Sequence, residues 1–443
     1  MQVTVTTTSD LTPAKPTFRE ALDVWFRIGL LSFGGPTGQI ALMHRMLVDE
    51  RKWIDDGRFL NALNFCMLLP GPEAMQLATY AGWWLHGLRG GLAAGLLFVV
   101  PGAFVVLGLS MIYASFGHVP AIEALFLGIK AAVLIIVVEA LLRISKRALK
   151  QPAHWLLAAL SFVAIFFFGA PYPVLVAMAA IIGYLLALRQ TTVSATLAAQ
   201  SLHGVPVSRT LGTAALWLTI WLAPLLAIAA AFGKSHVLTQ IGFFFSKLAV
   251  VTFGGAYAVL GYMGQDVATQ YGWITAGEMM DGLGLAETTP GPLILVTEFV
   301  GYLAGFRHGG AGPSFAMGLA GAAVTLWATF APCFLWVFTG APYVEWLNSQ
   351  PRLKGALAGV TAAVVGVILN LALWFALHVF FGKVTLNAVG LLRLWTPDIT
   401  TLDWRIVGLA GVSAFLLLWR HWNVITVLAV ASAAALALQS AGF

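Results

Sequence analysis

Long apolar stretches occupy most of this 443-residue chain, and they constrain its fold more than any other feature. A helix that crosses the hydrocarbon core of a membrane needs about 20 predominantly apolar residues. Stretches close to or above that length cover residues 91–116, 121–142, 152–169, 172–188, 210–232, 313–338, 355–381, 404–419 and 422–441. Lipid offers no hydrogen-bond partners, so a spanning helix satisfies its backbone within itself. The sequence therefore predicts an all-α polytopic membrane protein.

Charged side chains are scarce. The chain has 24 Lys and Arg and 18 Asp and Glu residues, which is 9% of the total, while 60% of its residues are hydrophobic. A soluble domain carries about 25% charged residues. This balance excludes an ordinary soluble enzyme and a disordered chain. The basic residues are scattered between apolar runs, so the pI near 9.4 does not indicate nucleic-acid binding. The expected surroundings are membrane lipid.

Four further apolar stretches, 20–43, 59–86, 240–263 and 279–305, are interrupted by glycine and proline. The interruptions read Phe33-Gly34-Gly35-Pro36, Pro70-Gly71-Pro72, Phe253-Gly254-Gly255 and Pro290-Gly291-Pro292. Backbone freed by such breaks must be buried in protein or line a wet cavity. We therefore expect broken or re-entrant helices at these four places.

The breaks recur because the chain contains an internal duplication. A shift of 220 residues aligns 27–72 with 247–292 without a gap, and 11 of the 46 aligned positions are identical. Further along the chain, a shift of 231 pairs Pro101 with Pro332. The predicted organisation is a cytoplasmic tail over 1–17, a first repeat over 18–190, a linker over 191–238 with one transmembrane span, and a second repeat over 239–443.

Equivalent loops of the two repeats carry opposite charge signatures. Loop 143–150 is rich in Lys and Arg, whereas its counterpart 382–403 balances two basic residues with two acidic ones. Loop 44–58 contains several basic residues and its counterpart 264–278 contains none. Cytoplasmic loops carry the excess of Lys and Arg, so we expect inverted repeats with the N-terminus in the cytoplasm and the C-terminus outside. Transporters with inverted repeats bind their substrate at the interface between the repeats.

Whether 20–43 and 59–86 re-enter the membrane or span it stays open, although the re-entrant arrangement gives the stronger charge asymmetry. Residues 1–17 contain no apolar core, so no cleavable signal peptide is expected.

Several motifs together resemble the chromate ion transporter family in its long, two-domain form. They are Phe26-Arg27-Ile28-Gly29-Leu30-Leu31-Ser32-Phe33-Gly34-Gly35-Pro36, then Arg51-Lys52-Trp53-Ile54, Leu69-Pro70-Gly71-Pro72 with Gln76, and Gly87-Leu88-Arg89-Gly90-Gly91. The second repeat departs from the first at Ala256, where Pro36 stands, and at Glu278, where Arg58 stands.

The resemblance implies transport of a divalent tetrahedral oxyanion. The expected activity is chromate efflux in exchange with, or in competition with, sulfate, by an alternating-access secondary mechanism in the plasma membrane of a bacterium. An oxyanion channel and a sulfate uptake transporter are the alternatives.

The breaks indicate an anion independently of this resemblance. Helix N-termini at membrane depth present free N–H groups that bind anions, and glycine lets the backbone approach a ligand. The candidate binding residues at the breaks are Gly34, Gly35, Pro70, Gly71, Pro72, Gly254, Gly255, Pro290 and Gly291. Close packing of helices on glycine is the alternative explanation.

Arg27 and Lys247 are equivalent cations within apolar segments, and each precedes its Phe-Gly-Gly by six residues. A charge inside a membrane segment is costly and suggests a function, so we predict that this pair stabilises a dianion. Snorkelling to the nearest interface is the alternative. Lys130 also lies in an apolar span, but its counterpart is Thr361, and we interpret it as snorkelling or packing.

Uncharged donors and carboxylates complete the candidate site. Ser32, Thr252, Thr288, Thr289 and Gln76 are candidate donors to the anion, although hydroxyls of this kind also bond back to their own helix. Glu73 and Glu287 are candidate proton-coupling residues. Glu139 is predicted to form an i,i+4 ion pair with Arg143.

No zinc-protease motif, P-loop or paired His/carboxylate cluster is present in the sequence. The chain is therefore not expected to be an enzyme, nor to hold a metal or another cofactor. Cys66 and Cys333 lie in apolar context and are interpreted as small buried side chains. A homodimer is compatible with the sequence.

Overall fold

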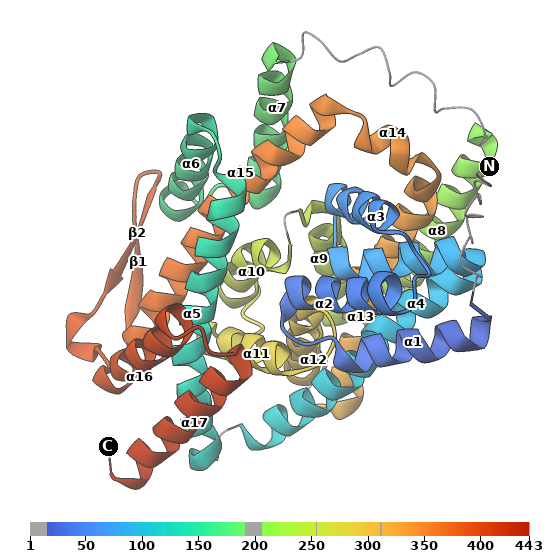
Figure 1. Ribbon diagram of the computed structural model, residues 1–443. Helices are drawn as coiled ribbons and strands as arrows, with labels where there is room; N and C mark the ends of the chain where they lie inside the picture. Colours follow the sequence, from blue (N-terminus) through green and yellow to red (C-terminus); the bar gives the residue numbers. More distant parts are fainter. Residues whose placement is uncertain (1–15, 118, 191–205, 254, 311, 443) are drawn as a thin grey trace, which may run out of the picture.

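The structure is a computed structural model that describes residues 16–117, 119–190, 206–253, 255–310 and 312–442, and it is almost entirely helical (Figure 1). The first repeat comprises α1 (Phe18–Leu31), α2 (Gly35–His44), the π-helical turn η1 (Arg45–Glu50), α3 (Asp56–Leu68), α4 (Glu73–Phe116), α5 (Pro120–Ala148), α6 (Pro152–Phe168) and α7 (Tyr172–Gln190). Helix α8 (Val207–Phe232) then links this repeat to the second one.

The second repeat follows the same order. Its elements are α9 (Val237–Val251), α10 (Ala256–Gln265), η3 (Asp266–Gln270), α11 (Ala276–Thr288), η4 (Leu293–Leu295), α12 (Val296–His308), α13 (Phe315–Gly340), η5 (Ala341–Tyr343), α14 (Val344–Asn348) and α15 (Pro351–Phe380). Strands β1 (Val384–Val389) and β2 (Leu392–Pro397), η6 (Ile399–Thr401), α16 (Trp404–Ala414), η7 (Phe415–Trp419) and α17 (Val424–Ser440) complete it.

Local details of the two repeats agree with the duplication. The π-helical turns η1 and η3 stand at equivalent positions. Lys52 and Gly272, which the shift of 220 aligns, both have a positive φ, of 53° and 63°. The Trp53 N–H donates to the Leu47 carbonyl at 2.9 Å, and the Trp273 N–H donates to the Val267 carbonyl at the same distance. The predicted repeat is thus confirmed at the level of single turns.

Two features of the fold differ from the sequence analysis. Helix α4 combines two helices across a kink, because His86 and Gly87 leave helical geometry and Gly87 has a φ of 61°. Loop 382–403 contains an antiparallel hairpin in which Val384 pairs with Pro397 and Val389 with Leu392, around Gly390. The alternation of apolar and polar residues in these two short strands is weak beside the long apolar helices that flank them, and no strand was predicted there.

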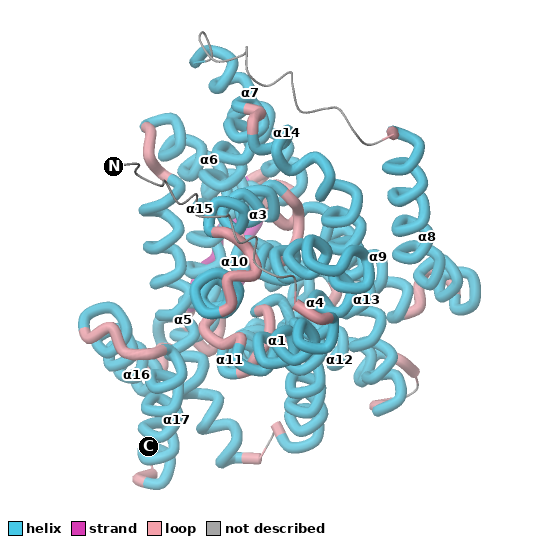
Figure 2. The backbone as a smooth tube through the Cα atoms, turned by 45° about the vertical axis from the view of Figure 1, so that its right-hand side comes forward, coloured by secondary structure: helices cyan, strands magenta, loops and turns pink. Residues whose placement is uncertain are grey.

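Among the described residues, five segments are long and apolar enough to cross a membrane: α4, α5, α8, the continuous run from α13 to α14, and α15. Helices distant in sequence pack together, with α15 against α6 and α7 and with α17 against α5 (Figures 1 and 2). Helix α8 stands at the edge of the molecule in both views. Its exposed apolar side chains include Leu211, Leu216, Leu226 and Phe232, as expected for a lipid-facing linker.

Candidate anion-binding site

The helices end where the sequence predicts breaks, and glycine makes these breaks feasible. Gly34, Gly35, Gly71, Gly255 and Gly291 all have a positive φ, between 70° and 113°. Residues with a Cβ adopt such angles at a cost. Gly254, the remaining glycine that we predicted, lies outside the described residues.

The breaks of the two repeats contact each other through a reciprocal pair of backbone hydrogen bonds. The Gly71 N–H donates to the Thr252 carbonyl at 2.9 Å, and the Gly291 N–H donates to the Ser32 carbonyl at 2.9 Å. Gly71 is equivalent to Gly291 and Ser32 to Thr252, so each bond is the counterpart of the other. An approximate twofold axis between the repeats would produce this arrangement. The four breaks therefore form one centre at the interface between the repeats.

Two glutamines support this centre. The Gln39 side-chain amide donates to the Gly291 carbonyl at 2.6 Å, and the Gln76 amide donates to the Pro70 carbonyl at 2.6 Å. Gln76 was predicted as a donor to the anion, but here its N–H group holds the break. Gln39 was missed, because a single glutamine in an apolar helix gave no signal of its contact with the other repeat.

The predicted hydroxyl donors bond to their own helices. Ser32 donates to the Ile28 carbonyl and Thr252 to the Leu248 carbonyl, each at 2.5 Å. Thr288 donates to Leu285 at 2.9 Å and Thr289 donates to Ala286 at 3.2 Å. In this conformation the hydroxyl hydrogens satisfy helix carbonyls, which was the alternative explanation for them.

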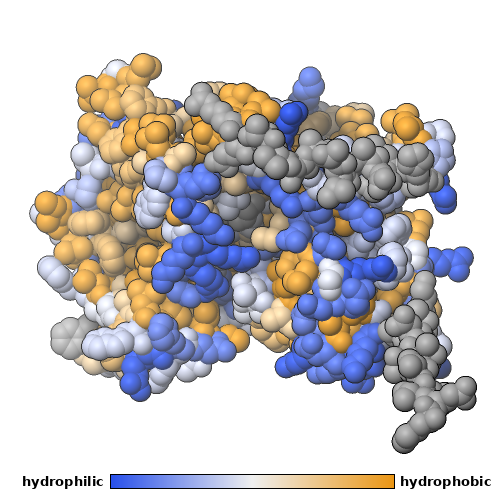
Figure 3. All heavy atoms as spheres, turned by 45° about the horizontal axis from the view of Figure 1, so that its top comes forward, coloured by the Kyte–Doolittle hydropathy of each residue, from blue (hydrophilic) through white to orange (hydrophobic). Residues whose placement is uncertain are grey.

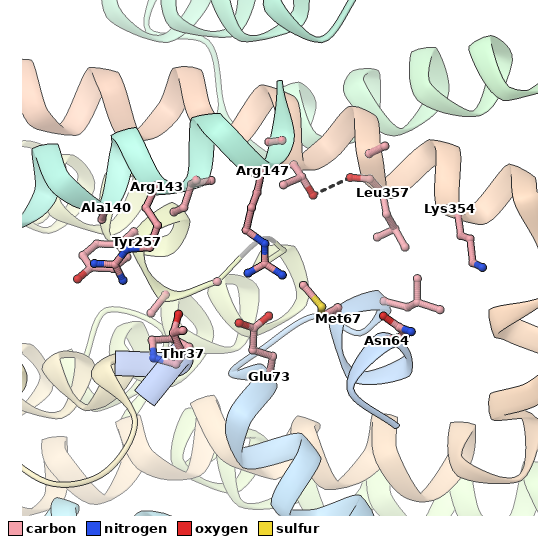
Figure 4. A pocket seen from close by; sticks show the side chains of 18 of the residues that line it. Thr37, Asn64, Met67, Glu73, Ala140, Arg143, Arg147, Tyr257, Lys354 and Leu357 are labelled. Carbon is pink, nitrogen blue, oxygen red and sulfur yellow. Dashed lines mark hydrogen bonds between the residues drawn. The ribbon is translucent and has the colours of Figure 1, made fainter. Parts of the chain in front are cut away.

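A cavity of about 570 Å³ opens beside the breaks (Figure 4). Its walls include Pro36 and Thr37 at the start of α2, together with their equivalents Ala256 and Tyr257 at the start of α10. Seen from a direction in which the top of Figure 1 comes forward, hydrophilic residues gather around a hollow in the molecule (Figure 3). Apolar atoms cover much of the flank.

Four basic residues line the cavity. Arg143, Arg147 and Lys150 come from the end of α5 and the residues after it, and Lys354 comes from the first turn of α15. Figure 4 shows the Arg147 guanidinium pointing toward the Glu73 carboxylate at the start of α4, and Arg143 beside Tyr257. The cavity therefore combines clustered positive charge with a polar carboxylate.

The helix starts in this wall lack side-chain caps, and Pro36 at the start of α2 has no N–H to donate. Gly34 precedes α2 and Gly255 precedes α10, and neither helix receives a hydrogen bond from a capping side chain. The first N–H groups of a helix have no partner within that helix. By contrast, Thr17 caps α1 and Thr275 caps α11 through capping boxes. Pro72 and Pro292 stand at the N-cap positions of α4 and η4, and neither of these elements has a side-chain cap.

Both predicted proton-coupling carboxylates lie at this site. Glu73 lines the cavity. Glu287 on α11 is buried and accepts a hydrogen bond of 2.5 Å from the hydroxyl of Tyr257, which lines the cavity. The predicted ion pair between Glu139 and Arg143 is present. It joins Arg143 to a carboxylate on its own helix and holds the arginine at the cavity wall.

The structure does not bring Arg27 and Lys247 into the cavity wall. The Arg27 side chain is 58% exposed and its Nε atom lies 3.0 Å from Asp23 Oδ2. Lys247 lies over the Tyr262 ring, with its Nζ 5.4 Å from the ring centroid, and lines a separate cavity with Arg393. Their role in anion binding stays a prediction.

Sequence reasoning missed the basic residues that line the cavity. It used Arg147 and Lys150 only as signals of a cytoplasmic loop, and Arg143 also as the ion-pair partner of Glu139. The available signal was spacing, since Arg143 and Arg147 are four residues apart and share one face of α5. The contribution of Lys354 depends on the packing of α15 in the other repeat, which no local pattern reveals.

The repeated broken helices, the long apolar spans and the basic cavity between the repeats define a multi-pass membrane transport protein. The model of the family described as Chromate transporter matches residues 19–184 and 239–438, which is most of both repeats. The chain belongs to this family, whose members are transporters and not enzymes.

Several curated proteins are similar over most of their length. A chromate transport protein of Pseudomonas aeruginosa is 30% identical over 435 residues, covering 96% of this chain and 94% of that protein. A chromate transport protein of Cupriavidus metallidurans is 29% identical over 371 residues, covering 80% of this chain and 81% of that protein. An uncharacterised transporter of Methanocaldococcus jannaschii is 25% identical and covers 91% of this chain and 90% of its own. No solved structure matches the chain.

Proposed function

We propose that this protein exports chromate across the plasma membrane of a bacterium and that the anion binds in the cavity between the repeats. The observation that carries this proposal is the position of Arg143 and Arg147 in one cavity with the uncapped starts of α2 and α10, with Lys354 in another part of the same wall. Basic side chains and free helix N-termini together favour a small dianion. The relatives named for chromate transport agree with this ligand.

Glu73 gives the site a means of proton coupling. Its carboxylate lies in the same cavity as Arg147 and would repel a dianion bound there. Protonation of Glu73 would free Arg147 for the anion, and Glu287 could exchange protons with the cavity through Tyr257. The protonation state of Glu73 would then set the affinity of the cavity for chromate.

An alternating-access cycle fits the arrangement of the cavities. The charge rule places the end of α5, and with it this cavity, on the cytoplasmic side. Lys247 and Arg393 line a second cavity beside the β1–β2 hairpin, at the other end of α10. We propose that the anion enters from the cytoplasm and leaves past this second cavity, with sulfate as a competing or exchanged anion. The proposed N-terminus is cytoplasmic and the C-terminus is outside.

Counterflow in proteoliposomes tests the transport mechanism. Vesicles of known orientation are loaded with unlabelled chromate or sulfate, and entry of labelled chromate is followed. A carrier predicts that internal chromate accelerates entry, with sulfate acting as a competitor or an exchange partner. Entry that is insensitive to the internal anion would indicate a channel, and no entry above empty liposomes would contradict chromate transport.

A further inference from the structure

Asp281 is a buried carboxylate of α11 that the proposed anion site does not use. Only 2% of the residue is exposed. Its Oδ2 atom accepts a hydrogen bond of 2.8 Å from the Tyr113 hydroxyl of α4 and lies 3.4 Å from the Lys130 ammonium of α5. Its Oδ1 atom is buried and has no hydrogen-bond partner among the described residues. Lys130 is thus partnered across the repeats, which corrects its interpretation as a snorkelling or packing residue.

This ion pair is costly for a purely structural contact. Lys130 is the eleventh residue of α5, about 15 Å from the start of a helix long enough to span the membrane. The Asp281 side chain is 3% exposed and the Lys130 side chain is 27% exposed, so the carboxylate bears most of the loss of hydration. Such a loss often costs as much as the attraction between the two charges returns. Ionisable groups at such depth mark ion or proton pathways. The half-satisfied carboxylate, whose Oδ1 atom is free to take a proton, is therefore a candidate coupling site.

Helix α11 carries two further carboxylates, one on each side of Asp281 along the helix axis. Glu278, one turn earlier, accepts two hydrogen bonds from Arg307, and both residues line a cavity of about 680 Å³ with His308 and His378. Glu287, six residues later, bonds to Tyr257 at the proposed anion cavity. The distance from Glu278 to Glu287 along the helix is about 14 Å. Acidic groups thus lie at intervals along α11 between two cavities.

Among the described residues, the charged and titratable groups that contact Asp281 are Lys130 on α5 and Tyr113 on α4. Glu278 lies on its own helix with Arg307 of α12 as its partner. On the other elements packed against α11, His378 of α15 lines the cavity with Glu278, and Tyr257 of α10 bonds to Glu287. Glu298 of α12 forms no hydrogen bond or ion pair with Asp281 among the described contacts. Helix α17, which also packs on α11, carries no ionisable residue.

The acids on α11 are specific to the second repeat. The positions equivalent to Glu278, Asp281 and Glu287 in α3 are Arg58, Asn61 and Met67. Helix α3, which is the equivalent of α11 and is followed by the same Pro-Gly-Pro break, therefore does not need these carboxylates. A structural requirement of the fold would be expected in both copies, whereas a coupling path is needed only once.

We propose that Asp281 is the proton-binding site that couples the proton gradient to anion export, and that Lys130 is its counter-ion. This inference rests on the proposed transport function and names its driving ion. A proton entering past Glu278 and Arg307 binds the free Oδ1 atom and neutralises the carboxylate. Lys130 is then released from its partner. The same proton leaves toward Glu287 and the cytoplasmic cavity, so that one bound proton enters and is released unchanged.

The test compares two assays of the whole protein in proteoliposomes. Chromate counterflow at equal pH needs no net proton movement. In the second assay an imposed pH gradient drives net flux. The side opposite the chromate has the lower pH, and both sides stay above pH 7. Asp281→Asn is expected to keep counterflow within about twofold and to lose gradient-driven flux by more than tenfold. Glu123→Gln, an exposed carboxyl of α5, is the matched control and should keep both.

Each remaining result decides the proposal. Gradient-driven flux that persists in Asp281→Asn overturns it, and so does wild-type counterflow without any response to the gradient, which leaves chromate transport standing. No wild-type flux in either assay would instead contradict the transport function itself.

Asp281→Asn can also lose flux in both assays, because it leaves the Lys130 ammonium without its ion-pair partner. The double variant Lys130→Met with Asp281→Asn removes that charge. Counterflow restored without gradient-driven flux supports the proposal. Restored gradient-driven flux, or loss of both activities, identifies a structural ion pair and overturns it.

Discussion

Arg147 lines the cavity together with Glu73, the first residue of α4, and its guanidinium points toward the Glu73 carboxylate (Figure 4). A charge-assisted contact contributes about 1.5–3 kcal/mol. Arg147→Gln should therefore raise the chromate concentration for half-maximal flux by roughly 10- to 100-fold, since about 1.4 kcal/mol corresponds to tenfold.

Lys146 provides the control for this prediction. It precedes Arg147 on the same helix and has the same charge, but it does not line the cavity. Lys146→Gln should leave half-saturation unchanged when protein levels in the membrane are matched. Equal effects of the two substitutions would mean that bulk surface charge, rather than a defined contact, attracts the anion.

The close approach between the repeats gives a second prediction for single residues. A Cβ atom on Gly102 of α4 would lie 2.2 Å from the Pro290 carbonyl oxygen, whereas a Cβ on Gly108 of the same helix would meet nothing within 4 Å. Overpacking typically costs about 1–3 kcal/mol. Gly102→Ala should lower the melting temperature of the detergent-purified protein, and Gly108→Ala should not. Indistinguishable melting curves would show that α4 can move away from this break without loss.

The sequence predicted individual site residues only where their role is local. Break glycines are identified by composition, and Gly71 and Gly291 have the positive φ that such a break requires. Glu73 and Glu287 were placed by their distance from the prolines. Asp281 and Lys130 could not be paired in advance, because their contact depends on how α11 packs against α5.

At the scale of elements, the half-helices α2 and α10 depend on backbone conformations that an L-residue resists. Gly255 has a φ of 94° and a ψ of 173° with no atom within 4 Å of its Cβ position. Strained backbone of this kind costs about 1–3 kcal/mol for a residue with a side chain. Gly255→Ala should therefore reduce maximal flux by roughly tenfold or more, because the substitution reorients the N–H groups at the start of α10.

Gly212→Ala in the linker helix α8 is the control for Gly255→Ala. Its Cβ also meets nothing within 4 Å, but its φ is helical, so flux and membrane level should match the wild type. Membrane level measured by immunoblot separates lost transport from lost protein. Normal flux in Gly255→Ala would exclude the exposed start of α10 from the binding site.

The sequence predicted those elements that are marked by a long apolar run or by a glycine at a break. Helices α6, α7 and α15 fall within a few residues of the apolar stretches, because lipid demands long uninterrupted runs. Helix α5 continues past its predicted end at residue 142 to Ala148, so most of the predicted loop 143–150 is helical, because helix formation does not require apolar residues. The hairpin β1–β2 was missed, since two six-residue strands outside the apolar runs give a weak alternation. The kink at Gly87 was missed for a related reason, because one glycine among several carried no distinct signal.

At the scale of the whole molecule, the proposed export path requires opposite orientations of the two repeats. A reporter fused after Lys150 follows α5, and one fused after Lys383 follows α15, its equivalent in the second repeat. We predict that the first reports the cytoplasm and the second the outside, because segment 143–150 is rich in Lys and Arg whereas its counterpart 382–403 balances two basic residues with two acidic ones. A fusion to α8, which links the repeats, calibrates both signals. Reporters on the same side would contradict inversion and, with it, the assignment of the cavities to opposite faces.

The most direct test of the claim that the anion binds in the cavity between the repeats is to locate bound chromate in the protein. Chromium scatters anomalously, so a crystal of the purified protein soaked in chromate reveals the position of the metal atom without a model of the ligand. We predict a chromium peak among Arg143, Arg147 and the starts of α2 and α10. The peak should weaken in Arg147→Gln. A peak beside Arg27 or Lys247, with the cavity between the repeats empty, would contradict the proposed site.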